Sequence, residues 1–340
     1  MKAVVYDRTG PSSVLTVVER SPREPGADEV RVRVAVSGVN PTDWKGRRGR
    51  GDGARLDDAK VPNQDGAGVV DAVGANVSTL RPGDRVWLWD VAWQSVEGTA
   101  QELVTLPATH VVALPASESF DTGASLGIPA LTAHEALAAA AAGPSRLAPG
   151  ALDGRWVLVT GGAGAVGHAA IQLAAWAGAQ VVATVSSSEK ADLARAAGAH
   201  HVVNYRTQDV ASAVRALVPG GVDVVVDVDV ARNASSVVGA VAANGTIAAY
   251  ATADLDVVTL PVMPLMAKNV AVVFVLTYTV SDDRKRDAVL AVSGALADGA
   301  LRVGAEHGLP ITRFVLGETA AAHDAVEAGT VGKVLIDVAG

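Results

Sequence analysis

The residues that point most clearly to chemistry are three glycines, Gly162, Gly164 and Gly167, which follow the pattern G-x-G-x-x-G. An apolar run with β propensity, 157–160, precedes them, and a helical pattern over 168–177 follows. Glycines at this spacing let backbone N–H groups approach a pyrophosphate, and the following helix directs the positive end of its dipole at that anion. The sequence therefore predicts a dinucleotide site rather than an ordinary glycine-rich turn. The expected contacts are Gly162, Ala163, Gly164, Ala165 and Val166.

The end of the next predicted strand, 180–185, indicates which dinucleotide binds. NAD sites usually carry Asp or Glu there, and that carboxylate accepts hydrogen bonds from the ribose 2′-OH. This chain has three serines over 186–188 and then Glu189, which we expect to point outward. The serines also suit the N-cap of the next helix, and the two roles are compatible. Hydroxyls and a lysine suit a 2′-phosphate, so the local chemistry favours NADPH, held by Ser186, Ser187 and Lys190.

Length and composition limit the classes of protein. A chain of 340 residues suggests two domains. A net charge of -8 argues against a surface for nucleic acid or anionic membranes. No uninterrupted apolar run reaches membrane-spanning length, and the charged N-terminus is typical of a strand rather than a signal peptide. There is no cysteine, so disulfides and thiol chemistry are excluded. We expect a cytoplasmic enzyme that acts on a small molecule.

The chain divides into two regions with different residue patterns. Residues 1 to about 125 contain short β-like runs and turns, such as the alternating Val and Arg of 30–36. From about 128 to 276, strand-sized runs alternate with Ala-rich helical runs, which predicts an α/β unit with a doubly wound parallel sheet. Its six expected strands are 156–160, 180–185, 201–204, 222–226, 246–249 and 270–276, and a helix and two β-like runs follow at 284–298, 313–316 and 332–338.

Several short motifs, in order along essentially the whole chain, resemble one known family. They are the opening turn Gly10–Leu15, Gly38–Lys45 (GVNPTDWK), Gln64–Val70 (QDGAGVV), Leu131–Ala133 (LTA), Asn204–Arg206 (NYR) and Gly332–Val334 (GKV). The chain resembles the zinc-independent branch of the medium-chain dehydrogenase/reductases, the quinone oxidoreductase or ζ-crystallin-like group. The resemblance implies a GroES-like, β-rich catalytic domain over 1–126 and 279–340, split by a Rossmann dinucleotide-binding domain over 127–278.

The residues also address the question of zinc. In the related alcohol dehydrogenases a catalytic zinc needs Cys, His and acidic ligands. At the first ligand position this chain has Asn40, and where a G-H-E segment would carry the second it has Asn63, Gln64 and Asp65. We therefore expect no metal. Without a Lewis acid, conjugate reduction suits the site better than alcohol oxidation, with hydride passing from nicotinamide C4 to the β-carbon of an enone or quinone while hydrogen bonds stabilise the enolate.

The candidate catalytic residues follow from the resemblance. Asn40 lies where the family places a polar residue near the nicotinamide, and it is also typical of a turn before Pro41. Asp43 is expected to orient its neighbours or cap a turn. Lys45 stands where a tyrosine is usual, and proton donation, phosphate binding and simple solvation all stay open. Thr132 resembles the family's threonine near the carboxamide, or is a hydroxyl at a helix N-terminus. The expected substrate pocket comprises Trp44, Asp65 and Trp93.

Ligands of open α/β sheets lie beyond the carboxyl ends of the parallel strands, which identifies further cofactor contacts. Tyr205 is placed to stack on the adenine and Arg206 to pair with an anion. Lys333 resembles the family's C-terminal basic residue that reaches the cofactor. The other expected contacts are Asp227, Ala249, Tyr250, Ala251, Phe274, Val275 and Leu276.

The predicted last strand, 270–276, is long, apolar and free of proline. Such an edge needs cover, which a loop or a second copy can supply; we expect pairing with a second copy, which gives a homodimer. Two other functions stay open. One is an enoyl-thioester or carbonyl reductase of a biosynthetic pathway, for which Arg47, Arg48 and Arg50 are the hint of a basic entry groove. The other is an NADPH-binding protein with little turnover. The G-x-S-x-G run at 123–127 lacks the preceding strand that a hydrolase elbow needs.

Overall fold

The chain forms two compact units in the computed structural model, which describes residues 1–140, 143–252 and 257–338. The first unit comprises Met1–Ile128 and Ile311–Gly340, and the second Pro129–Pro310. The first boundary agrees closely with the expected 126/127. The second differs from the expected 278/279, because the segment after residue 278 packs within the second unit. His168 Nε2 lies 2.8 Å from the carbonyl oxygen of His307, and Trp176 Nε1 donates to Asp298 at 2.9 Å.

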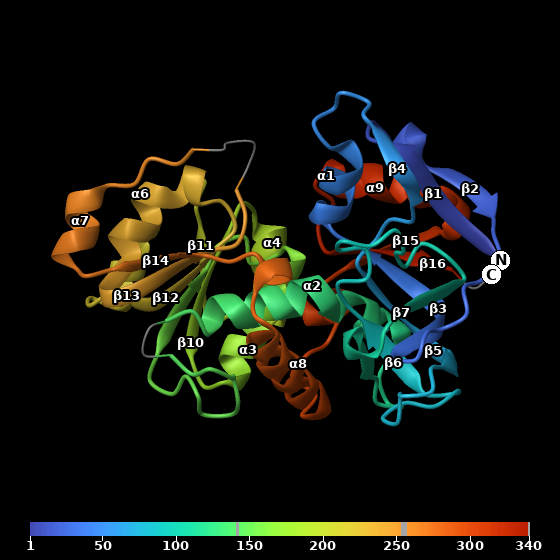
Figure 1. The fold of residues 1–340 in the computed structure, drawn as a ribbon. Helices are drawn as coiled ribbons and strands as arrows, with labels where there is room; N and C mark the ends of the chain where they lie inside the picture. Colours follow the sequence, from blue (N-terminus) through green and yellow to red (C-terminus); the bar gives the residue numbers. More distant parts are fainter. Residues whose placement is uncertain (141–142, 253–256, 339–340) are drawn as a thin grey trace. The chain divides into compact units, whose positions relative to one another are not determined.

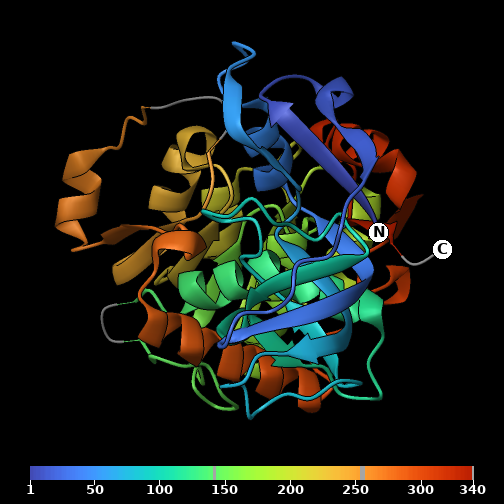
Figure 2. The same cartoon turned by 45° about the vertical axis from the view of Figure 1, so that its right-hand side comes forward.

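The second unit contains a parallel sheet whose strands, among the residues described, run in the order β11-β10-β9-β12-β13-β14 (Figures 1 and 2). All the pairs are parallel, and the chain reverses its direction of travel across the sheet between β9 and β12. This is the doubly wound order of a dinucleotide-binding sheet, and it confirms the expected fold. The strands are β9 (Trp156–Val159), β10 (Gln180–Val185), β11 (His201–Asn204), β12 (Val222–Asp227), β13 (Val241–Ala249) and β14 (Ala271–Phe274).

Helices cover this sheet because its central strands are apolar on both faces. Leu158, Val182 and Val225 are fully buried in one cluster, the pattern typical of a parallel sheet between helical layers. Polar caps define where helices begin: the Asp209 side chain accepts from Ser212 N at 2.8 Å. The helices are α3 (Ala165–Trp176), α4 (Ser188–Ala196), α5 (Val210–Leu217), α6 (Val230–Ala240), α7 (Val262–Ala267) and α8 (Asp282–Ala297).

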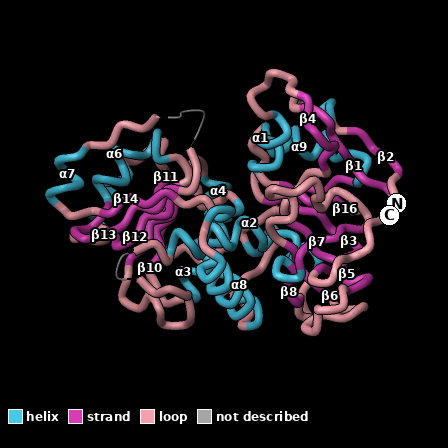
Figure 3. The backbone as a smooth tube through the Cα atoms, viewed as in Figure 1, coloured by secondary structure: helices cyan, strands magenta, loops and turns pink. Residues whose placement is uncertain are grey.

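The first unit is rich in strands, as Figure 3 shows in magenta. In the described part of the chain, one sheet has the order β15-β16-β3-β5-β6-β8, with β7 also paired to β3, and a smaller sheet has the order β2-β1-β4. The strands are β1 (Lys2–Arg8), β2 (Thr16–Glu19), β3 (Glu29–Val39), β4 (Arg55–Lys60), β5 (Asp65–Val73), β6 (Arg85–Leu88), β7 (Leu103–Pro107), β8 (Val111–Ala113), β15 (Ile311–Val315) and β16 (Lys333–Asp337). The helices are α1 (Pro41–Arg48), α2 (Phe120–Leu137), which continues into the second unit, and α9 (Thr319–Glu327).

The long strand β3 brings the polar residues of this unit together. The valines of its alternating run are buried while Arg31 and Arg33 face outward and pair with Asp71. At its far end Gly38 pairs with Asp65 of β5 on one side and with Leu335 of β16 on the other. The end of β3 therefore lies beside the first residues of β5 and β16. Within the described residues, no helix is both long and apolar enough to cross a membrane.

Candidate functional site

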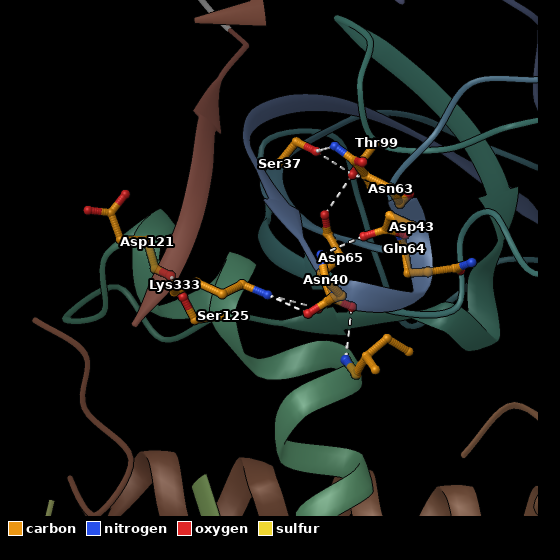
Figure 4. Close-up of polar contacts among 11 residues, drawn as sticks. Ser37, Asn40, Asp43, Asn63, Gln64, Asp65, Thr99, Asp121, Ser125 and Lys333 are labelled. Atoms are coloured by element: carbon orange, nitrogen blue, oxygen red, sulfur yellow. Dashed lines mark hydrogen bonds and ion pairs between the residues drawn. The ribbon is translucent and has the colours of Figure 1, made fainter. Parts of the chain in front are cut away.

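A buried polar cluster lies where β3 ends and β5 and β16 begin (Figure 4). Asn40 donates from Nδ2 to Asp65 Oδ2 at 2.7 Å, and its Oδ1 accepts from Lys333 Nζ at 2.7 Å. Lys333 Nζ also lies 3.4 Å from Asp65 Oδ2. All three side chains are at most 2% exposed. The structure thus joins two expected site residues, Asn40 and Asp65, to a lysine at the other end of the sequence.

The Asp65 carboxylate has hydrogen-bond donors on both of its oxygens. Besides Asn40 on Oδ2, the backbone N–H of Ile128 in α2 donates to Oδ1 at 2.8 Å. This approach requires glycine at position 127, because a Cβ there would lie 2.1 Å from Asp65 Oδ1. Burial raises the pKa of Asp65 and lowers that of Lys333, and the charge of each partner opposes the effect of burial on the other.

Asp43 fixes the start of α1. Its Oδ2 accepts from the backbone N–H of Asn40 at 2.6 Å, the reach-back contact of a capping box, and its Oδ1 accepts from Gln64 N at 3.2 Å. The carboxyl is buried, and this burial, with the nearby charge of Asp65, raises the pKa of Asp43 to about 8. The structure therefore gives Asp43 the orienting and capping role that the sequence suggested.

The cluster continues into polar residues that sequence reasoning missed. Asn63 donates to Ser37 Oγ at 3.0 Å and lies 2.9 Å from His323 Nε2, and Ser37 Oγ lies 2.7 Å from Thr99 Oγ1. Burial lowers the pKa of His323 to about 3, so this imidazole is neutral. His323 lies 260 residues from Asn63, and nothing local in the sequence marks the pair. The one local signal was the residue type at position 63, because asparagine tolerates a positive φ and Asn63 has a φ of 79°.

Trp44, Lys45 and Trp93 have no hydrogen bond or ion pair to Asn40, Asp65 or Lys333 among the contacts that the described structure shows. Lys45 is exposed and its Nζ stands 5.8 Å from the centre of the Trp44 ring. Trp93 is 36% exposed. Lys333, which the resemblance placed against the cofactor, instead has its ammonium inside the cluster, bonded to Asn40 and close to Asp65. In the second unit, Thr132 is buried in the interior of α2 and not at a helix N-terminus.

The glycine turn of the second unit has the expected geometry. Gly164 is the N-cap of α3, and the first N–H groups of this helix have no partner within it. Gly161 has a φ of 66°, and a Cβ on Gly167 would lie 2.4 Å from the carbonyl oxygen of Gly161. The turn is thus as tight as the motif requires, and it lies at the carboxyl end of β9, where the strand order reverses. The backbone N–H groups of Ala165 and Val166 suit an anion there.

The residues expected near a 2′-phosphate lie at neighbouring strand ends. Val185 at the end of β10 pairs with Asn204 at the end of β11. Ser187 caps α4, its side chain accepting from Lys190 N at 3.3 Å. Glu189 is exposed as expected, and hydrogen bonds from Ser187 and Ser188 lower its pKa, so its carboxylate engages the serines rather than only solvent. Ser186 precedes this cap, and Tyr205, which is 51% exposed, and Arg206 follow β11.

A cavity of about 400 Å³ opens at the carboxyl ends of β13 and β14. All six residues expected there line it, together with three that sequence reasoning missed. The lining consists of Val230, Ala249, Tyr250, Ala251, Thr252, Val258, Phe274, Val275 and Leu276. Its apolar character suits a flat ring rather than a charged group.

Asp227, an expected cofactor contact, is a buried residue at the end of β12. None of its surface is exposed, and its Oδ1 accepts from Thr160 Oγ1 at 2.7 Å and from Asn233 Nδ2 at 2.8 Å. Thr160 Oγ1 accepts in turn from Val228 N at 2.9 Å. Burial raises the pKa of Asp227. One oxygen of the carboxyl therefore supports the residue that precedes the glycine turn, and the other, Oδ2, has no hydrogen-bond partner among the described residues.

Local structure argues against the hydrolase alternative. The G-x-S-x-G run at 123–127 lies within α2, where Ser125 Oγ donates to the Asp121 carbonyl at 2.8 Å, so no strand leads into this serine. The structure described for 1–140, 143–252 and 257–338 contains no group of three or more His, Cys, Asp or Glu placed to hold a metal.

Two family models match the chain. Residues 26–116 match the alcohol dehydrogenase GroES-like domain, and residues 165–303 match the zinc-binding dehydrogenase domain. The first match confirms the expected GroES-like fold of the β-rich unit. A solved structure of a mycobacterial protein complexed with NADPH is 28% identical, with a TM-score of 0.83 and coverage of 99% of this chain and 100% of that one.

Curated relatives carry several kinds of name, and one of them is a Schizosaccharomyces pombe alcohol dehydrogenase, 30% identical over 248 residues, 65% of this chain and 67% of that one. Mouse quinone oxidoreductase is 30% identical over 240 residues, 69% of each chain. A 2-haloacrylate reductase from a Burkholderia species is 33% identical over 231 residues, 67% of this chain and 66% of that one. The rat synaptic vesicle membrane protein VAT-1 homologue is 35% identical over 207 residues, 61% of this chain and 48% of that one. The chain thus spans about half the length of this last relative.

The raised pKa of Asp43 predicts a pH dependence of stability. An acid whose pKa is about 8 in the folded chain binds its proton more tightly there than when unfolded, so stability falls as pH rises from about 4 towards 8. In Asp43→Asn this contribution, at most about 1.4 kcal/mol per pH unit, disappears. We expect denaturant unfolding between pH 5 and 8 to show a flatter profile for the variant. Asp57→Asn, at an exposed position of β4, is the control, and an unchanged slope in Asp43→Asn would contradict the assignment.

Proposed function

Because this chain belongs to the zinc-independent, quinone oxidoreductase-like branch of the medium-chain dehydrogenase/reductase family, we propose that it is an NADPH-dependent reductase of a quinone or of another activated C=C bond. The observation that carries the proposal is the glycine turn at the carboxyl end of β9, where the strand order reverses. The names of the mouse and Burkholderia relatives, a quinone oxidoreductase and a 2-haloacrylate reductase, support this acceptor class.

The residues of the second unit fit NADPH. The N–H groups at the start of α3 would bind the pyrophosphate, and Ser186, Ser187 and Lys190 the 2′-phosphate. Tyr205 would stack on the adenine and Arg206 pair with an anion. The cavity at β13 and β14 would hold the nicotinamide ring through Ala249, Tyr250, Ala251, Phe274, Val275 and Leu276 and exclude water from it. The bound cofactor supplies hydride at nicotinamide C4.

In the first unit we propose different roles for the candidate residues. Asn40 has both amide groups engaged and is 2% exposed, so it would act by orientation. Lys45 has an exposed ammonium and would donate a hydrogen bond or a proton to the acceptor oxygen. We keep Trp44, Trp93 and Asp65 as residues of the substrate pocket and, in the second unit, Thr132 as the contact of the carboxamide.

The alternative of a thioester reductase rests on the basic residues Arg47, Arg48 and Arg50. Arg47 is fully buried, and both Arg47 and Arg48 pair with Glu327, at 3.1 and 2.8 Å. Arg47 is therefore not open to a phosphorylated carrier, whereas Arg48, whose side chain is 56% exposed, and the exposed Arg50 remain at the surface. Thioester and carbonyl reduction, and NADPH binding with little turnover, remain as outcomes of the first test.

That test measures NADPH oxidation at 340 nm with a 1,4-quinone, a linear enone, an enoyl thioester and a simple ketone. We expect turnover of the quinone or the enone, preference for NADPH over NADH, and no loss of activity in EDTA. The control reaction omits the protein. Turnover of only the thioester or the ketone would reject the proposed acceptor class, and tight NADPH binding without any turnover would favour a cofactor-binding role.

The 2′-phosphate site makes a separate prediction. Replacing Lys190 by Met removes a cation that would bind the phosphate, and hydrogen bonds to charged groups contribute about 1.5–3 kcal/mol. We expect the dissociation constant for NADPH to rise about 10- to 100-fold and that for NADH to change little. Fluorescence titration of the nucleotide checks this, with Lys2→Met, an exposed lysine on β1, as the control. An equal loss for both nucleotides would contradict the assignment.

We also propose a homodimer. In the described sheet β14 is an edge strand paired only with β13, and it carries Phe274, which is 66% exposed. Pairing with a second copy would cover this edge. The cytoplasmic location expected from the sequence stays a prediction.

Light scattering after size exclusion tests the dimer. We expect twice the chain mass of 34.4 kDa for the native protein and the single mass for Phe274→Asp, because a charge on an apolar interface opposes association. Leu290→Asp on α8, at a residue 55% exposed, is the matched control and should stay dimeric. A native protein of single mass at high concentration would refute the proposal.

A further inference from the structure

We propose that Lys333 is a positioning residue whose ammonium is the built-in cation of the polar cluster of Asn40, Asp65 and Lys333, and that it does not bind the cofactor. Its side chain is 1% exposed. Its Nζ lies 2.7 Å from Asn40 Oδ1 and 3.4 Å from Asp65 Oδ2, two oxygens that come from separate segments and converge on one cation. Figure 4 shows the side chain reaching from β16 towards Asn40.

The backbone around Lys333 holds its aliphatic stem in place. Lys333 begins β16, which is antiparallel to β3 with Val334 opposite Val39. The stem passes Gly38, where a Cβ would lie 3.2 Å from Lys333 Cε and 2.1 Å from the carbonyl oxygen of Ala124. A close approach of three backbone segments thus encloses the stem. Turning the ammonium outward to a ligand would break both of its contacts and leave Asp65 buried without a counter-ion.

The charge of the cluster depends on this lysine. In the described part of the chain, Lys333 is the cation within ion-pair distance of Asp65. Asp43 of α1 is the other titratable group, and its charge interacts with those of Asp65 and Lys333. A buried carboxylate that loses its partner charge is strongly destabilised unless it takes up a proton. Removing the ammonium should therefore leave Asp65 protonated in the folded chain across neutral pH, whereas it ionises normally in the unfolded chain.

This gives a pH signature that loss of packing alone would not produce. In Lys333→Met the folded chain holds a further proton, on Asp65, which the unfolded chain releases above about pH 4, so its stability falls more steeply with rising pH than that of the native protein. We expect the midpoint of thermal unfolding to drop relative to the native protein by about 10 °C, with a larger drop at pH 8 than at pH 5.5. Lys2→Met, at an exposed lysine of the same unit, should show neither change.

A second variant keeps the test decisive if Lys333→Met folds poorly. In Lys333→Met with Asp65→Asn, the neutral amide can accept from Ile128 N and exchange a hydrogen bond with Asn40, so neither substituted position buries a charge. We expect this double variant to recover most of the lost stability and to lose the extra pH dependence. A double variant as unstable as the single one, or a single-variant deficit equal at both pH values, would overturn the role as a cation.

Nucleotide affinity separates this role from a cofactor contact. Titration of the folded variants with NADPH, followed by nucleotide fluorescence, should give dissociation constants within about twofold of the native value. A rise of tenfold or more in the double variant would show that Lys333 binds the cofactor, and would overturn the proposal. The stability measurements need no cofactor, so a native chain that fails to bind NADPH would count against the proposed function and leave the test of Lys333 intact.

Discussion

The fold of the first unit depends on one buried carboxylate, which has to find its hydrogen-bond donors within the protein and not in water. Asp65 has no exposed surface, and a buried charge is stable only when donors and a counter-ion surround it. The donors come from Asn40 after β3, Ile128 in α2 and Lys333 at the start of β16. The hydrogen bonds to Asp65 therefore fix the positions of three segments that are distant in the sequence. Gly127 is required because α2 must approach the carboxylate closely.

The second unit obeys a different constraint, the close approach of backbone to an anion. Here the glycines, not the charges, decide the geometry, since Gly167 must pack against the carbonyl of Gly161. Asp227 supports the same turn through Thr160, and Asn233 holds the carboxyl from α6. A polar side chain at the end of a strand can thus stabilise the turn as well as bind a ligand. Topology predicts the strand end but does not distinguish between these two roles.

The sequence predicted features that local patterns determine. Strand β10 and β11 occur at the expected residues, and the six residues expected at the ends of β13 and β14 share one cavity. Features that depend on distant contacts were harder to predict. His323 beside Asn63 and Lys333 beside Asn40 join segments more than 250 residues apart, and no periodicity encodes such pairs. The packing of α8 with the second unit likewise depends on contacts such as Trp176 with Asp298, which composition does not reveal.

A lysine and a metal ion would solve the electrostatic problem of Asp65 in different ways. A metal binds reversibly and needs several ligands in a fixed geometry, whereas an ammonium arrives with the chain and needs only acceptors around a single nitrogen. The cluster supplies such acceptors, an amide oxygen and a carboxylate. The positive charge is then tied to the folding of β16, and it is buried behind Asn40 rather than open to a substrate oxygen. Such a cation can orient groups but cannot act as a Lewis acid, which agrees with the proposed transfer of hydride to an acceptor that is already activated.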